Sequence, residues 1–175
     1  MEKLYLKQEA PRVRGEVTFF DVHENEIYHS RGSFMPMPQK CCAGALPPIP
    51  KEYELTDAND QAVVRILRTS SILTPEFEVM NLIAGVPICK TRKKSRITKA
   101  TVVITTEQGN YLVDGSIWHH EFDILNEQGI KIINMQKKSL VWGDTYEITI
   151  DSSQINVHSA AGIVLAVDCT YHSGN

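Results

Sequence analysis

The sequence predicts a mainly β protein, in which about twelve antiparallel strands close into a barrel around one hydrophobic C-terminal helix. Two observations lead to this fold class. Short runs of alternating apolar and polar residues, each followed by Gly, Asn or Asp, fill the chain from residue 3 to residue 150 and are typical of strands. Near its C-terminus the chain has a run, Ala160–Val167, that has no polar side. A helix that is apolar all round must be surrounded by other elements.

The alternating runs define the expected strands and leave little room for helix before residue 150. Each run has the length and the flanking turn residues of an antiparallel strand. The expected strands are Leu4–Lys7, Glu16–Val22, Glu26–Ser30, Tyr53–Asp57, Val63–Arg68, Glu76–Leu82, Val86–Thr91, Ala100–Thr106, Tyr111–Ile117, Glu121–Asn126, Ile130–Gln136 and Thr145–Ile150.

An internal repeat indicates how these strands are connected. The segments Phe77–Ser95 and Phe122–Ser139 each contain a strand, a turn with a glycine, a second strand and a closing Lys-Lys-Ser. The turns contain Gly85 and Gly129, so each copy is predicted to be a β-hairpin. Successive hairpins make a meander, and each needs neighbours to bury its apolar face.

The C-terminal helix is expected from about Ser153 to Thr170, after Asp151–Ser153, which can supply an N-cap. The core of the run, Ile163–Leu165, would also suit a buried strand. The length of the segment and its small residues, Ala160, Ala161, Gly162 and Ala166, favour the helix. Eighteen helical residues rise ~27 Å and strands of six to eight residues span ~20–27 Å, so one buried helix is about as tall as the strands. A barrel of about eight strands is filled by its own side chains, whereas about eleven leave space for a helix.

Composition indicates one soluble domain over residues 1–175, with 42% hydrophobic residues. The Pro-rich segment Ser33–Pro50 is expected to be a surface loop, because proline cannot donate to a strand ladder. The chain has 18 Lys and Arg against 21 Asp and Glu, so no nucleic-acid partner is expected. No signal peptide or membrane span is visible, and a cytoplasmic protein is therefore expected.

No catalytic, cofactor-binding or metal-binding residue is expected. The four cysteines have no CxxC spacing and are expected to be reduced and mostly buried. His119 and His120 would point to opposite faces of a strand, so a metal site there is disfavoured. Trp118 and Trp142 are expected to be core or rim residues, and Asp168 is expected to have a structural role near the end of the helix.

One segment stands out electrostatically, because Lys90–Lys99 contains six cations and no acid. Near an anionic membrane each such side chain is worth about 1 kcal/mol, so the segment could hold the protein at a lipid surface. The alternative is that these residues only solvate a strand end and protect it from edge pairing. The candidate ligand-binding residues are Lys90, Arg92, Lys93, Lys94, Arg96 and Lys99.

Several phrases in the second half of the chain resemble one family: Gly115–Ile124, Lys137–Ser139, Gly143–Ile148 and Val164–Asp168. They resemble the LURP-one-related family, which belongs to the tubby C-terminal-like superfamily together with the phospholipid scramblases, and most of all its compact bacterial members. The resemblance runs from Leu4 to Asp168. It implies a twelve-stranded barrel around a hydrophobic C-terminal helix. Tubby domains bind phosphoinositide headgroups through basic side chains, but the family has no catalytic motif to transfer.

The expected function is therefore a non-enzymatic tubby-like binding module, peripheral at the membrane, that recognises anionic phospholipid headgroups through the Lys90–Lys99 segment. The alternative is a structural or protein-interaction domain that uses the Ser33–Pro50 loop as its contact surface. A scramblase-like activity is a third hypothesis, which the sequence disfavours because calcium-binding acids and a membrane anchor are not visible.

Overall fold

A computed structural model describes residues 1–8, 17–34, 50–69, 76–94, 101–116, 121–138 and 144–172. These ranges contain twelve strands and one helix. The elements are β1 (Glu2–Gln8), β2 (Val17–Phe20), β3 (Glu26–Phe34), β4 (Pro50–Asp57), β5 (Ala62–Arg68), β6 (Glu76–Asn81), β7 (Val86–Lys94), β8 (Thr101–Thr106), β9 (Gly109–Ser116), β10 (Glu121–Leu125), β11 (Lys131–Lys138), β12 (Asp144–Ile150) and α1 (Val157–His172).

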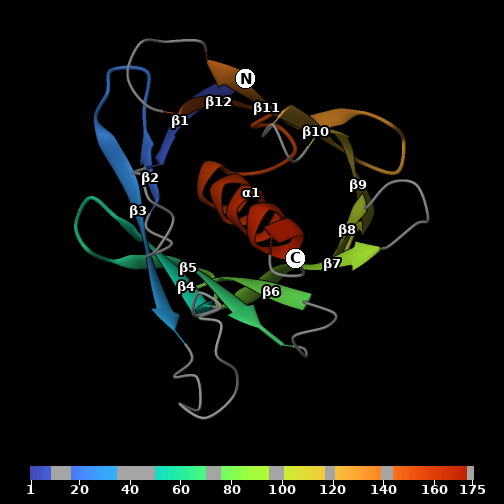
Figure 1. The fold of residues 1–175 in the computed structure, drawn as a ribbon, viewed down its shortest axis with the longest axis horizontal. Helices are drawn as coiled ribbons and strands as arrows, with labels where there is room; N and C mark the ends of the chain where they lie inside the picture. The colour runs from blue at the N-terminus through green and yellow to red at the C-terminus, as the bar shows by residue number, and fades with distance from the viewer. Residues whose placement is uncertain are drawn as a thin grey trace, which may run out of the picture.

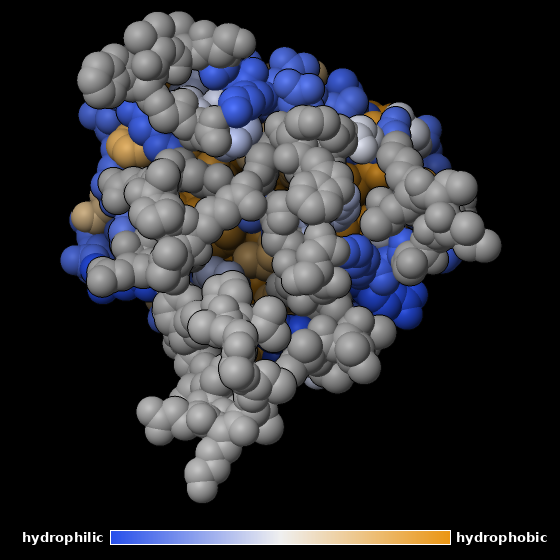
Figure 2. Space-filling model, in the orientation of Figure 1, coloured by the Kyte–Doolittle hydropathy of each residue, from blue (hydrophilic) through white to orange (hydrophobic). Residues whose placement is uncertain are grey.

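The strands form a closed up-and-down barrel, in which each strand is antiparallel to its neighbours in sequence. The pairing of β1 with β12, from Glu2 opposite Ile150 to Gln8 opposite Asp144, closes the ring. The helix α1 lies inside the ring of strands (Figure 1). Hydrophilic residues lie around the outside and hydrophobic residues toward the centre (Figure 2). The fold class predicted from the sequence is confirmed.

The Pro-rich segment differs from its expected bounds. Strand β3 continues through Ser33 to Phe34, and β4 already begins at Pro50. Phe34 and Pro50 are opposite each other, next to an irregularity in the register. Proline is tolerated at the first residue of a strand. The rest of the expected loop, residues 35–49, lies outside the described residues, and so does its expected role as a protein contact.

The two copies of the repeat are the hairpins β6–β7 and β10–β11, as predicted. In each copy an asparagine side chain organises the turn. Asn81 Oδ1 accepts backbone N–H groups at 3.0 Å from Ile83 and from Ala84, and Asn126 Oδ1 accepts from Gln128 and Ile130 at 3.0 and 2.9 Å. The glycines of the two turns have φ of 68° and 75°, a left-handed conformation that glycine adopts without strain.

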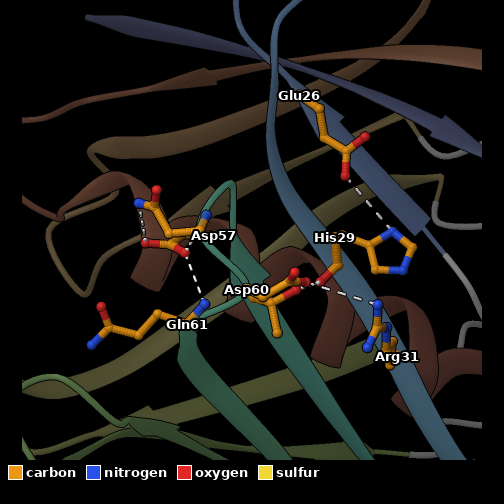
Figure 3. Close-up of polar contacts among 8 residues, drawn as sticks. Glu26, His29, Arg31, Asp57, Asp60 and Gln61 are labelled. Atoms are coloured by element: carbon orange, nitrogen blue, oxygen red, sulfur yellow. Dashed lines mark hydrogen bonds and ion pairs between the residues drawn. The ribbon is translucent and has the colours of Figure 1, made fainter.

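Aspartates have the same role in other turns at this end of the barrel. Asp57 Oδ1 accepts the N–H groups of Asn59 at 2.8 Å and Gln61 at 2.9 Å (Figure 3), which lowers the pKa of this carboxyl. Asp21 accepts from His23 and Asn25 at 2.7 and 2.9 Å. Because the strands alternate in direction, these short capped turns all lie at one end of the barrel, which we call the turn end.

The helix begins four residues later than expected. Asp151 does not cap it. Instead, the Asp151 carbonyl accepts the N–H of Gln154 at 2.9 Å and its carboxylate accepts from Ser153, which completes a turn before the helix. The N-cap is Asn156, whose Oδ1 accepts the N–H of Ser159 at 2.9 Å. Asp151 and Asn156 both offer capping side chains, and the turn that follows β12 uses Asp151.

The apolar run is enclosed on all sides, as its composition requires. The apolar side chains of Ala160–Val167 are at most 3% exposed. The strand alternative for Ile163–Leu165 is excluded, since the segment is helical within α1.

The helix lies off-centre and packs chiefly against β5, β6, β7 and β8. Its small residues allow this close approach: a Cβ on Gly162 would lie 2.7 Å from Cγ1 of Val64 and 3.2 Å from Cγ1 of Val79. Large inward side chains fill the remaining half of the barrel. Fully buried examples are Phe19, Ile133, Met135, Tyr146 and Ile148.

We expect Gly162→Ala to destabilise the protein although alanine favours helix. The helix preference is worth about 1 kcal/mol, but overpacking against the stiff Val64 side chain costs about 1–3 kcal/mol. Urea unfolding should therefore give a net loss of about 1 kcal/mol. In the double variant with Val64→Ala, the loss should be smaller than the sum of the two single losses. A Gly162→Ala protein more stable than the wild type would contradict the close approach.

A half-buried histidine joins the start of the helix to the turn between β6 and β7. Asn81 Nδ2 lies 3.2 Å from His158 Nε2. Because Asn81 Oδ1 already accepts two backbone N–H groups, the amide nitrogen faces the ring and donates to it. The accepting Nε2 must be unprotonated, so the ring is neutral. Burial lowers the pKa of His158 below 6.5.

This geometry predicts a loss of stability in mild acid. Unfolded His158 binds a proton below about pH 6.5 more readily than the folded form does, so the contribution is complete above pH 6.5 and declines as the pH falls below it. The free energy of unfolding, measured by urea titration, should fall further between pH 7.5 and 5.5 for the wild type than for His158→Gln, by less than about 1 kcal/mol because the ring is partly exposed. Equal pH dependence in the two proteins would refute this prediction.

Candidate binding surface

The first half of the basic segment lies on β7, where alternation divides it between the two faces of the barrel wall. Lys90, Arg92 and Lys94 point outward, whereas Thr91 and Lys93 point inward. A run of cations that is continuous in the sequence is therefore two separate sets in space.

Two of the outward cations face acids on the neighbouring strand. Lys90 Nζ lies 3.4 Å from Glu78 Oε1, and the register places Arg92 opposite Glu76, with 4.0 Å between Nε and Oε1. Such exposed pairs contribute little to stability, but they reduce the local positive potential. Lys94 is exposed and has no acid within ion-pair distance among the described residues.

Lys93 points into the barrel and serves the helix. Its Nζ donates to the backbone carbonyl of Tyr171 at 3.2 Å and lies 5.1 Å from the centre of the Tyr171 ring. The last carbonyls of a helix have no partner within the helix and carry partial negative charge. Lys93 therefore has a structural role at the helix C-terminus, whatever else it contacts.

A buried hydroxyl pair fixes the helix to the same strand. Thr170 Oγ1 donates to the carbonyl of Ala166 at 2.6 Å, so in its 2.5 Å contact with Thr91 Oγ1 the Thr91 hydroxyl must be the donor. Both threonines are 0% exposed. The hydroxyl protons of Thr91 and Thr170 thus each have an acceptor, as buried polar groups require.

Of the six expected binding residues, the structure places four, and Arg96 and Lys99 lie outside the described residues. It does not bring the four together on one surface. As a binding site the set stays a prediction, in which Lys94 is the described member with the fewest competing contacts.

Sequence reasoning missed a second set of cations, which comes from the ends of strands. Strands β1, β5, β7 and β11 run in the same direction, so their C-terminal ends meet at the end of the barrel opposite the turn end. Each carries Lys or Arg in its last two residues, a signal that the sequence contains, whereas β3 and β9, which run in the same direction, end in Phe34 and Ser116. We call this set the basic rim: Lys7, Arg68, Lys93, Lys94, Lys137 and Lys138. The described side chains of Glu52, Glu76 and Glu121 supply three acids at this end.

Several rim cations lie over aromatic rings. Lys7 Nζ is 4.7 Å from the centre of the Phe20 ring, and Lys137 Nζ is 6.0 Å from that of Tyr146. Arg68 is buried, and burial lowers the pKa of its guanidinium. Lys138 pairs with Glu147 at 3.0 Å. Contacts with aromatic rings and an acid therefore stabilise these cations in addition to their hydration.

The turn end has the opposite charge. The described connections 21–25, 58–61, 82–85, 107–108, 126–130 and 151–156 contain six carboxylates and no Lys or Arg. The barrel is therefore electrically polarised along its axis. The carboxylates are Asp21, Glu24, Asp60, Glu107, Glu127 and Asp151.

The interior offers little nucleophilic chemistry. Cys89 and Cys169 are buried and free, as expected, and burial raises the pKa of the Cys89 thiol to about 12. Burial also raises the pKa of Cys169, beside Asp168, and that of Tyr53. These groups stay protonated near neutral pH and are poor nucleophiles.

The described part of the chain offers neither a metal-binding cluster nor a helix that could span a membrane. No group of three or more His, Cys, Asp and Glu residues there could hold a metal ion. No helix within it combines the length and apolar character needed to cross a bilayer. His119, His120, Trp118 and Trp142 lie outside it.

This architecture defines a class, the closed twelve-strand barrel around a C-terminal helix. The LURP-one-related family model matches residues 2–168, and the chain belongs to that family, as its motifs suggested. It is similar in fold to the crystal structure of a protein from Arabidopsis thaliana, with 13% identity and a TM-score of 0.58 over 98% of this chain and 93% of that one. No curated protein matches the sequence.

The threonine pair predicts an asymmetric pair of mutations. Thr170→Val leaves the buried Thr91 proton without an acceptor and should cost about 1–3 kcal/mol. Thr91→Val leaves Thr170 bonded to Ala166 and should cost no more than about 1 kcal/mol. Urea unfolding of both variants and of the double variant measures the difference. Equal costs for the two would show that the donor assignment is wrong, and costs that add in the double variant would show that the two hydroxyls do not interact.

Proposed function

We propose that this chain is a non-enzymatic binding module that docks on anionic phospholipid headgroups at a membrane surface through its basic rim. The observation that supports the proposal most strongly is the gathering of strand-end cations at one end of the barrel. The Lys90–Lys99 segment contributes to this rim through Lys93 and Lys94.

The axial polarity supports an end-on orientation. A surface of anionic lipid attracts the basic rim and repels the carboxylates of the turn end, so the barrel is expected to approach with its rim first. The family suggests a tubby-like domain, and a tubby-like domain that recognises headgroups through basic side chains is consistent with this orientation.

A binding role is favoured over catalysis by the state of the described reactive groups. The thiols of Cys89 and Cys169 are buried and protonated.

The test is co-sedimentation with vesicles of phosphatidylcholine, with and without phosphatidylserine, at about 0.1 M salt. We expect binding only to the anionic vesicles, and a loss of about a hundredfold in the rim variant Lys7→Gln/Lys94→Gln/Lys137→Gln, at about 1 kcal/mol for each cation. High salt should weaken wild-type binding.

The matched control is Lys3→Gln/Arg31→Gln/Lys131→Gln, which removes the same charge away from the rim. It should retain wild-type binding to within about threefold. Equal loss in both triple variants would show that net charge alone decides binding, and binding to neutral vesicles would show that charge does not. Either result would overturn the proposal.

A further inference from the structure

An apolar row crosses the outer wall of the barrel, where polar residues are expected. The register places Val103 of β8 opposite Leu112 of β9, and Leu112 opposite Leu125 of β10. All three point away from the core, and Leu112 is 51% exposed. Three directly opposed apolar side chains on a solvent-facing wall form a continuous strip rather than scattered exposed residues.

A polar hollow lies beside this strip, one row closer to the basic rim. It has a volume of about 420 Å³, and Asp114, Glu121, Asp123, Asn134 and Lys137 are among its lining residues. The register again aligns the row, with Asp123 between Asp114 and Asn134. The volume is within the range of pockets that hold small side chains or ligands.

The hollow has a negative balance, with three carboxylates against one cation in its lining. Asp123 is already engaged: Asn134 donates to it at 2.6 Å, and Lys131 lies 2.8 Å away. Asp114 and Glu121 are exposed on the outer wall. Asp114 also has an interaction of its own, so the attraction for a cation that entered the hollow comes from the net negative charge of the lining and not from any single unoccupied carboxylate.

We propose that this outer wall of β8–β11 is a docking surface for a protein segment that places a Lys or Arg side chain in the hollow and neighbouring apolar side chains on the strip. Charge complementarity selects this occupant, because an anionic lipid would be repelled by the same carboxylates. Adjacent apolar and charged sites favour a peptide, which carries both groups at a fixed spacing. The inference does not rest on the lipid proposal, although the hollow adjoins the basic rim and shares Lys137 with it, and it adds a second contact on the outer wall of the barrel.

The test uses random peptides displayed on phage and selected against the whole chain at about 0.15 M salt. Enriched peptides should combine Lys or Arg with Leu, Ile, Val or Phe at a recurring spacing. Synthetic copies should bind Leu112→Ser at least tenfold more weakly, and Asp114→Asn/Glu121→Gln likewise, by isothermal titration. All three substitutions are on exposed side chains, so the fold should be retained, which thermal unfolding checks.

Matched controls are Ile83→Ser and Asp60→Asn, an apolar and an acidic substitution of exposed turn residues, which should bind within twofold of the wild type. No enrichment, enriched peptides without a cation, or equal binding to Leu112→Ser would overturn the proposal. A dimer that Leu112→Ser dissociates would assign the strip to a second copy of the chain instead. Vesicle binding by Leu112→Ser should be unchanged, so failure here is distinct from failure of the lipid proposal.

Discussion

The enclosure of one apolar helix is the constraint on which the rest of the structure depends. A segment with no polar side cannot lie on a surface, and a barrel of twelve strands is too wide for its own side chains to fill. The barrel encloses the apolar helix, and the helix fills the space inside the barrel. The two are in close contact at Gly162, where no Cβ could be accommodated without movement of Val64. Because the helix lies against β5–β8, bulky residues such as Phe19 and Tyr146 are needed to fill the opposite half.

The same arrangement sets the electrostatics. The helix ends at the basic rim and begins at the acidic turn end, so its dipole opposes the charge of each end of the barrel. Lys93 is a direct case, because its ammonium group donates to the Tyr171 carbonyl at the negative end of the helix dipole. A rim cation can therefore have two roles, and substitutions at Lys93 would mix stability with binding. Lys94, beside it but on the outer face, is a cleaner probe.

Most of the fold could be predicted because it follows from patterns between residues that are close in the sequence. Period-two alternation located every strand, and the repeat around Phe77 and Phe122 located two hairpins. The candidate site was not predictable in the same way. Adjacent cations look like one patch in a sequence, whereas in a strand they face opposite sides, and the partners of Lys90 and Arg92 come from β6 through a register that no local pattern determines. The predicted position of the N-cap was wrong because two segments, Asp151–Ser153 and Asn156, both offer capping side chains.

The pairing of β1 with β12 has a consequence for how the chain reaches this state. Strand β1, the first of the barrel to be made, gains its second neighbour only when β12 has been made, and the helix that fills the ring is made later still. Closure and filling are thus delayed until β12 and α1 have been made, and the hydrogen-bonding edges of a curling sheet stay open meanwhile. This topology therefore favours slow and cooperative folding. Until the barrel closes, the open sheet edges need protection from aggregation.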